Sequence, residues 1–518
     1  MKHRLVFVVL IALAPGFLCA QATQTARYER EQKNSDNDYI LISLQKEGLA
    51  LVRDKDKYKE GKKQWEIIRV DTTLQEVWLL EMEIENRLRL VGYDYRDNQI
   101  YLLYREGDHE ASSLVLFTIH TQSQAIGRYS IKQEMSFKVT HFSALANVVT
   151  LGGYVSSEPA ILLYDLQTEK AKLVPGFFVT NSELLDLRVN TNNTFNVLLI
   201  DRSNKQSKKL LLKTFDATGA SLLEDEIEIE SERTILSGIT STLINDELLV
   251  AGTWTEGNSK QASGIFTTLI NPFANQPVNY YDFGRFNHFL DYLSDKRAGK
   301  IKSKSADAAR TGVIPDFKTY AVPMRLDEQP EGFGLLVEVY QPANNFSPYP
   351  YYGNFGPPMY AYSPYGYNPF MNRYYNAPYQ YNQPVSGYSK MIYSALTVLD
   401  LNGKPVRDFG LKLGDLKTNS LEQTSDFTFY KGEIAMAFKK EKEVRILRSL
   451  TDEIEMDTLT SQLKNPNESV RNESEASYIR NWYNNVFYVW GYHTLRDSRK
   501  GALESGRQIF YINKIEVK

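Results

Sequence analysis

The sequence contains a single cysteine, Cys19, among its 518 residues. One cysteine cannot form an intramolecular disulfide, and its removal with a leader segment would leave no thiol for metal binding or nucleophilic catalysis. The chain must therefore be held together by burial of apolar surface, which its length allows.

Histidines are also few, and they are scattered singly along the chain: His3, His109, His120, His141, His288 and His493. No spacing among them places two imidazoles on one metal ion, so each is expected on the surface or in packing. The sequence has no Gly-x-Ser-x-Gly elbow and no phosphate-cradling glycine loop. It therefore predicts no cofactor and no metal site, and it identifies no catalytic residue.

Long apolar runs are absent after the first residues. Lys2 and Arg4 precede a short apolar run over 5–13, and small residues follow at Ala20 and Ala22. This order is typical of a secretory signal peptide over 1–22, with cleavage after Ala22 or, failing that, Ala20. The run is shorter than the roughly 20 residues of a membrane anchor, so no transmembrane segment is expected in the mature chain.

Export to the periplasm or cell surface follows from this interpretation. Lipid anchoring at Cys19 is not expected, because Phe17 and Leu18 are bulkier than the small residues required before an acylated cysteine. The formal net charge of −3 has no concentrated basic face of the kind that binds nucleic acid. The 34 tyrosines, together with runs rich in Val, Ile, Leu and Thr, favour an all-β class.

A strand–turn–strand unit recurs along the chain. In its clearest copy, over 394–411, the first run ends at Asp400 and an Asn-Gly turn leads into the second run. Other copies end their first run at Asp71, His120, Asp165, Asp216 and Asn271, at intervals of 45 to 55 residues. The next interval, 129 residues, returns to this period once 284–316 and 343–389 are set aside as insertions. The polar anchors are expected to cap their turns by binding backbone amides two residues on.

Two further strands precede each hairpin, so each unit has four strands. Units of this length and composition resemble the blades of the β-propeller superfold, over residues 39–518. The resemblance implies one propeller of about eight blades, or alternatively seven blades with an accessory sheet, and leaves 23–38 as an N-terminal segment that could close the last blade. The turns DLNGKPV and FDATGASL are similar to quinoprotein-type hairpins, but the tryptophan pattern of those repeats is missing and no cofactor is carried over.

The first insertion, 284–316, begins with apolar residues spaced for a short helix: Phe286, Phe289, Leu290 and Leu293. A basic tract follows from Lys296 to Lys304, and Gly299 interrupts it. This tract is expected to be a solvated loop, with binding of an acidic partner as the alternative.

The second insertion, 343–389, is rich in tyrosine and proline and carries one charged residue between 347 and 388, Arg373. Prolines at this density exclude helix and central strand, so a long loop is expected between the second and third strands of the sixth blade. Tyrosine rings offer rigid amphipathic contact to protein or sugar. The candidate binding residues are Tyr349, Tyr351, Tyr352, Tyr360, Tyr362, Tyr365, Tyr367, Arg373, Tyr374, Tyr375, Tyr379 and Tyr381.

The sequence favours a non-catalytic binding or scaffolding propeller of the bacterial cell envelope. Its rim loops would contact an envelope or surface protein, or a polysaccharide. The alternative is a glycosidase or lyase that gathers carboxylates from separate blades at the centre of the ring. The oligomeric state is left open.

Overall fold

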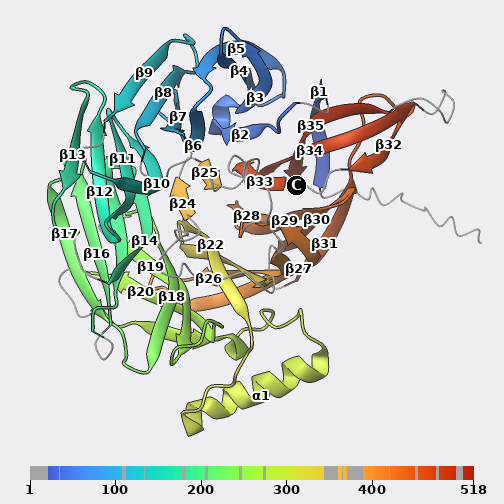
Figure 1. The fold of residues 1–518 in the computed structure, drawn as a ribbon. Helices are drawn as coiled ribbons and strands as arrows, with labels where there is room; N and C mark the ends of the chain where they lie inside the picture. Colours follow the sequence, from blue (N-terminus) through green and yellow to red (C-terminus); the bar gives the residue numbers. More distant parts are fainter. Residues whose placement is uncertain are drawn as a thin grey trace, which may run out of the picture.

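The computed structural model describes residues 22–33, 36–107, 112–132, 135–177, 181–204, 208–243, 248–271, 276–342, 360–363, 366–369, 389–418, 421–449, 453–473, 478–497 and 506–518. Within these ranges the chain forms an all-β propeller of eight antiparallel blades (Figure 1). The expected fold class is confirmed, with eight blades rather than seven. Residues 1–21 of the predicted signal peptide, Cys19 among them, lie outside the described residues, whereas Ala22, the predicted cleavage position, is the first residue of a strand.

The first four blades each consist of four strands that are consecutive in the sequence. Blade one contains β2 (Ile40–Ser43), β3 (Leu49–Lys59), β4 (Lys62–Val70) and β5 (Glu76–Glu85). Blade two contains β6 (Leu88–Arg96), β7 (Gln99–Glu106), β8 (Leu114–His120) and β9 (Ile126–Ile131). Blade three contains β10 (Phe137–Leu145), β11 (Val148–Val155), β12 (Glu158–Asp165) and β13 (Lys170–Val174). Blade four contains β14 (Ser182–Val189), β15 (Thr194–Asp201), β16 (Lys209–Asp216) and β17 (Ser221–Glu228).

The remaining blades carry the insertions and the closure of the ring. Blade five contains β18 (Arg233–Thr240), β19 (Leu248–Glu256), β20 (Gly264–Ile270) and β21 (Asn279–Asp282). Blade six contains β22 (Tyr320–Gln329), β23 (Gly332–Gln341), β26 (Ser389–Leu399) and β27 (Pro405–Thr418). Blade seven contains β28 (Ser425–Tyr430), β29 (Glu433–Lys440), β30 (Glu443–Ser449) and β31 (Glu455–Thr460). Blade eight contains β33 (Tyr478–Tyr483), β34 (Val486–Asp497), β35 (Arg507–Val517) and β1 (Ala22–Glu31), and β32 (Glu468–Glu473) also pairs with β34.

The position of a strand within its blade determines which of its residues are buried and which are exposed. A middle strand such as β7 has six consecutive buried residues, because neighbouring blades pack against both of its faces. The outermost strand β17 alternates instead, with Ile227 buried and Glu226 and Glu228 exposed. The first strands lie innermost, and those of neighbouring blades contact one another around most of the ring (Figure 1).

The polar turn anchors behave as the sequence predicts. Oδ1 of the anchor aspartate accepts the backbone amide two residues on, at 2.8 Å for Asp71, Asp165 and Asp216 and at 2.9 Å for Asp400. At His120 the ring Nδ1 accepts the amide of Gln122 at 3.2 Å. The amides of Thr168 and Gln167 hold the pKa of Asp165 below its usual value. The turn after Asn271 lies outside the described residues.

The ring is closed by a strand from the opposite end of the chain. β1 runs antiparallel to β35, from the pair Ala22 and Val517 to the pair Glu31 and Ile509. Blade eight thus receives its outermost strand from the N-terminal segment, which covers an edge that would otherwise be exposed. Closure also brings β1 beside blade one.

Glu66 of β4 links this closing strand to blade one, and its side chain is buried. Its carboxylate pairs with Arg30 of β1 and Arg53 of β3, each at 3.0 Å, and accepts the Tyr39 hydroxyl at 2.6 Å. Burial opposes ionisation of Glu66, but the Tyr39 hydrogen bond and the two guanidinium charges outweigh it and hold the pKa of Glu66 below its usual value.

The helix of the first insertion lies elsewhere than the sequence pattern indicated. Residues 286–293 form bends and turns, whereas α1 spans Asp295–Thr311 and includes the basic tract. The expectation of a short helix followed by a basic loop was therefore wrong. The apolar residues Phe286, Phe289 and Leu290 are instead buried against blades five and six, next to Phe283.

Packing explains why the basic tract is helical despite Gly299. Ala298, Ile301, Ser305 and Ala308 follow one another at helical spacing and form its inner face, with Ile301 in the same hydrophobic cluster as Phe283. An interior glycine costs about 1 kcal/mol relative to alanine, which this contact offsets. In the part of the chain that is described, no helix is long and apolar enough to cross a membrane.

We expect Glu66→Ala to lower the free energy of unfolding by about 2 to 3 kcal/mol, because Arg30 and Arg53 lose their shared buried partner and keep Glu76 and Asp36 as ionic partners. The matched control is Glu81→Ala, which removes a half-exposed partner of Lys55 and should change stability by less than about 1 kcal/mol. Urea denaturation of both variants measures the difference. Equal losses would show that Glu66 contributes no more than a surface pair.

Candidate functional site

The strand directions give the ring two distinct faces. Because the strands of a blade alternate in direction, turns between strands one and two and between three and four lie on one face, here called the turn face. Loops between strands two and three and the links to the next blade lie on the opposite, connection face. Both insertions leave the ring from the connection face, since one joins β21 to β22 and the other joins β23 to β26.

Aspartates on the first strands join neighbouring blades. Asp94 of blade two accepts the amide of Ala144 in blade three at 2.8 Å. Asp186 of blade four accepts the amide of Thr240 in blade five at 2.7 Å, and Asp426 of blade seven accepts the amide of Asn481 in blade eight at 2.8 Å. Each of these buried carboxylates is thereby used to hold the ring together.

Two arginines near the turn face reach past the neighbouring blade. Arg96 of blade two donates to the Asn193 side chain of blade four at 3.0 Å. Arg188 of blade four donates to the carbonyl of Leu326 in blade six at 3.0 Å and to Glu328 at 3.1 Å. The polar side chains of this face therefore cross-link blades two, four and six.

A carboxyl cluster lies where blades six, seven and eight meet, formed by Glu338, Glu422 and Arg480. Glu338 of β23 is enclosed, and its Oε1 accepts the amides of Thr424 at 3.0 Å and Ser425 at 2.9 Å, as well as both hydroxyls. Burial raises the pKa of Glu338 to about 7 despite these hydrogen bonds.

Glu422 is the less enclosed member of the carboxyl cluster, since the residue as a whole is only partly buried although its carboxyl group is buried. Burial of its carboxyl group raises the pKa of Glu422 to about 7, opposed by Arg480 and reinforced by Glu338. Arg480 is itself fixed by donation to the carbonyl of Gln423 at 2.7 Å. A carboxyl group that titrates near neutrality can give or take a proton at neutral pH.

The tyrosine-rich insertion emerges between the second and third strands of blade six, as the sequence predicts. Within it the structure describes a hairpin of β24 (Tyr360–Ser363) and β25 (Gly366–Pro369), which contains three of the candidate residues: Tyr360, Tyr362 and Tyr367. The other candidates lie outside the described residues: Tyr349, Tyr351, Tyr352, Tyr365, Arg373, Tyr374, Tyr375, Tyr379 and Tyr381.

The hairpin lies toward the middle of the ring rather than at its rim. β24 contacts β10 and β14, and β25 contacts β2 and β6, which are the innermost strands of blades one to four (Figure 1). The insertion therefore starts in blade six and reaches the inner strands on the other side of the ring. No sequence pattern indicated this path, because it depends on which blades face each other.

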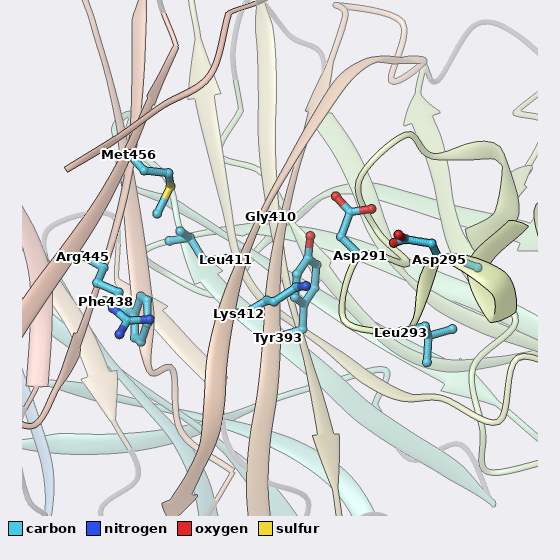
Figure 2. Close-up of a pocket in the computed structure, with 11 residues that line it drawn as sticks. Asp291, Leu293, Asp295, Tyr393, Gly410, Leu411, Lys412, Phe438, Arg445 and Met456 are labelled. Atoms are coloured by element: carbon cyan, nitrogen blue, oxygen red, sulfur yellow. The ribbon is translucent and has the colours of Figure 1, made fainter. Parts of the chain in front are cut away.

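A pocket of about 500 Å³ separates the first insertion from blades six and seven (Figure 2). Asp291 and Asp295 line its insertion side, and Lys412 and Arg445 line the strands of the two blades. The buried Tyr393 between them donates its hydroxyl to the carbonyl of His288 at 2.6 Å.

Gly410 makes this anchoring contact possible. A Cβ at this position would lie 1.7 Å from the Tyr393 hydroxyl oxygen, so the ring could not cross β27 there. Asp408 of β27 makes a second contact with the insertion, because it accepts the backbone amide of Asn287 at 2.9 Å. The insertion is thus fixed to the side of blade six.

The histidines occupy capping and packing positions, as expected where they are described. His141 and His493 are buried, and burial lowers the pKa of His141 to about 4. His288 contacts Asp291 at 2.9 Å on the first insertion. Among the described residues, no three His, Cys, Asp or Glu side chains are grouped to hold a metal ion. His3 and His109 lie outside those residues.

The inter-blade residues were missed by the sequence reasoning, although a signal was present. Asp-Tyr-Arg at 94–96 and Asp-Leu-Arg at 186–188 each precede the first turn of a blade. A recurring Asp-x-Arg at that point of the repeat could have marked them as structural residues. It could not have identified their partners, which lie 50 to 140 residues away.

Comparisons with known proteins add little to this picture. No family model matches the chain, and no curated protein matches it. Similar solved structures include the β-propeller domain of the Trilobed protease from Pyrococcus furiosus, at 9% identity and a TM-score of 0.33, over 82% of this chain and 93% of that chain. The polysaccharide lyase Uly1 is 7% identical with a TM-score of 0.36, over 92% and 99% of the two chains.

A third similar structure is prolyl oligopeptidase B from Galerina marginata. It is 8% identical with a TM-score of 0.39, and the match covers 93% of this chain and 56% of that chain. Similarity this distant does not allow the activity or substrate of those proteins to be assigned to this chain. The assignment as a propeller rests on the eight blades themselves.

We expect Glu338→Gln to flatten the pH dependence of stability. The pKa of Glu338 is about 7 in the folded protein and about 4.5 in the unfolded chain, so the folded state retains a proton that the unfolded state releases. Its contribution therefore makes stability fall as pH rises from about 4.5 to about 7, by up to about 3 kcal/mol. Glutamine keeps the accepting oxygen and has no proton to lose.

Urea denaturation at pH 5 and pH 8 measures this effect. The variant should gain stability relative to the parent protein at pH 8, and the exposed Glu226→Gln serves as control. If the free energy of unfolding changes between pH 5 and pH 8 by the same amount in Glu338→Gln as in the parent protein, Glu338 does not hold a proton in the folded state.

Proposed function

We propose that this protein is a non-catalytic binding or scaffolding propeller of the bacterial cell envelope. It is exported by its N-terminal signal peptide and works in the periplasm or at the cell surface. The partner is an envelope or surface protein, or a polysaccharide, and the contact is made on the connection face. The tyrosine-rich insertion is the main recognition element.

The path of that insertion is the observation that carries the proposal. An insertion that starts in blade six and whose hairpin contacts β2, β6, β10 and β14 brings tyrosine-bearing chain toward the middle of the ring. Tyrosine suits such a position, because its ring buries apolar area at low entropic cost and its hydroxyl can hydrogen-bond a protein or a sugar. On the inner strands, Asp94, Asp186 and Asp426 are already used in joining blades.

The alternative is a glycan-active enzyme, and the carboxyl cluster is what favours it. Glu422 is less enclosed than Glu338, and its pKa of about 7 suits a general acid. Its companion Glu338 is enclosed by the hydrogen bonds of Thr424 and Ser425. The cluster thus offers at most one carboxyl group for catalysis, whereas glycoside hydrolysis ordinarily uses two.

The proposal is tested by capture of a partner from an envelope extract. The mature protein is compared with a variant in which residues 347–388 are replaced by a short Gly-Ser turn. We expect the parent protein to capture a defined partner and the variant to lose at least 90% of it. Its thermal unfolding midpoint should stay within a few degrees, because the flanking strands β23 and β26 pair along their own length.

A variant of unchanged length, Tyr360→Ser with Tyr362→Ser and Tyr367→Ser, shows whether capture requires the tyrosine rings or only the presence of the loop. It should lose capture as well. If all three proteins capture the same partner, the tyrosine insertion is not the recognition element.

The enzymatic alternative has its own test with Glu422→Gln. The parent protein and this variant are incubated with a panel of neutral and acidic polysaccharides, and new reducing ends are measured. We expect no turnover by either protein. Turnover by the parent that falls at least a hundredfold in Glu422→Gln would replace the binding proposal with the enzymatic one.

A further inference from the structure

Helix α1 has two sharply different faces. Its inner residues, Ala298, Ile301, Ser305 and Ala308, contact the body of the protein. Its outer face carries Lys296, Lys300 and Lys304, all exposed and spaced four residues apart. Successive lysines of this set, the lysine stripe, are therefore about 6 Å apart along the helix axis. The helix projects outward from the ring (Figure 1).

The charge of this helix is not balanced locally. Six lysines and arginines stand against two aspartates in Asp295–Thr311, within a chain whose formal net charge is −3. One of those aspartates, Asp307, already pairs with Arg310 at 3.3 Å. Among the described residues, the structure contains no ion pair or hydrogen bond made by the side chains of the lysine stripe. Like charges four residues apart destabilise a helix, so the stripe is not explained by helix stability.

The helix is nevertheless held rigidly. It ends at Gly312 in the left-handed conformation, and the amide of Gly312 returns to the carbonyl of Ala308. Lys302 donates to the carbonyl of Asn287 at 2.6 Å, and Ser305 donates to the side chain of Asp282. The backbone positions of the stripe are therefore fixed relative to the ring, so that binding orders the lysine side chains but not the chain that carries them.

We propose that the lysine stripe binds a linear acidic polysaccharide lying along the outer face of α1. Carboxylate or sulfate groups repeated along an extended glycan would meet the ammonium groups of Lys296, Lys300 and Lys304 in turn. Lysine suits this partner, because its compact ammonium group binds an anion without requiring the planar geometry of guanidinium. This site is separate from the tyrosine-rich insertion and does not depend on it.

A glycan fits this surface better than a membrane does. Helices that bind a bilayer surface bury an apolar face in it. The apolar residues of α1 are turned inward, and in the insertion 284–316 the exposed large hydrophobic residue is Val313, beyond the end of the helix. The regular spacing of the stripe favours a linear polymer of repeating charge over an irregular acidic protein surface.

The test is titration of the full mature protein with polygalacturonate, with neutral dextran and with vesicles that contain 30% anionic lipid. The stripe variant is Lys296→Gln with Lys300→Gln and Lys304→Gln, which preserves helix propensity. We expect it to bind polygalacturonate at least tenfold more weakly than the parent protein. The slope of log affinity against log salt should fall by about two to three in magnitude, since three charge contacts are lost.

The control removes the same charge elsewhere, at the exposed lysines of Lys57→Gln with Lys62→Gln and Lys170→Gln. It should change affinity less than twofold, and replacement of the stripe by three arginines should retain binding. The proposal is overturned if the parent protein does not bind polygalacturonate, or if the stripe variant and the control variant weaken binding equally. It is also overturned if dextran binds as well as polygalacturonate, or if the vesicles bind more tightly than the polymer. Replacement of 347–388 should leave this binding intact, which separates it from the function proposed above.

Discussion

Closure of the ring is the constraint on which the rest of this structure depends. Eight blades pack face to face only if the last sheet meets the first, and here the outermost strand of the last sheet comes from the beginning of the chain. The pairing of β1 with β35 fixes this strand, and the buried Glu66 joins it to blade one through Arg30. A chain without intramolecular disulfides thereby connects its two ends by a β-ladder and a buried charge cluster.

The two faces of the closed ring differ in what they carry. On the inner strands and toward the turn face, Asp94, Asp186, Arg96 and Arg188 are used to join blades to one another. The connection face instead carries both insertions, each anchored to blade six. It is the face where the chain departs most from its repeat, and departures from a rigid repeat are where a propeller can acquire a specific partner.

The repeat itself could be predicted from the sequence because its signals are local. A polar anchor, a turn and two alternating runs depend on residues within a few positions of each other, and the capping by Asp71, Asp165, Asp216 and Asp400 follows from that pattern. The helix of the first insertion was misplaced for the opposite reason. Phe286 and Phe289 have helical spacing, yet they are buried in turns, and the basic tract is helical because Ile301 and Ala308 pack inward.

The candidate site was less predictable than the fold. The tyrosines were evident from composition, but the approach of their hairpin to the inner strands of blades one to four depends on the ring as a whole. The raised pKa of Glu338 likewise depends on its burial between blades, where Thr424 and Ser425, 86 and 87 residues further along the chain, enclose it. Contacts between distant blades leave no periodic trace in the sequence.

The central claim is that a partner approaches the connection face, and site-specific photo-crosslinking tests it most directly. A photoreactive residue is placed either at Gln341, exposed at the end of β23 on that face, or at Asp97, exposed in the first turn of blade two on the turn face. After incubation with envelope extract and illumination, we expect a discrete crosslinked partner from position 341 and none from position 97. Crosslinking of the same partner from position 97 but not from 341 would contradict it.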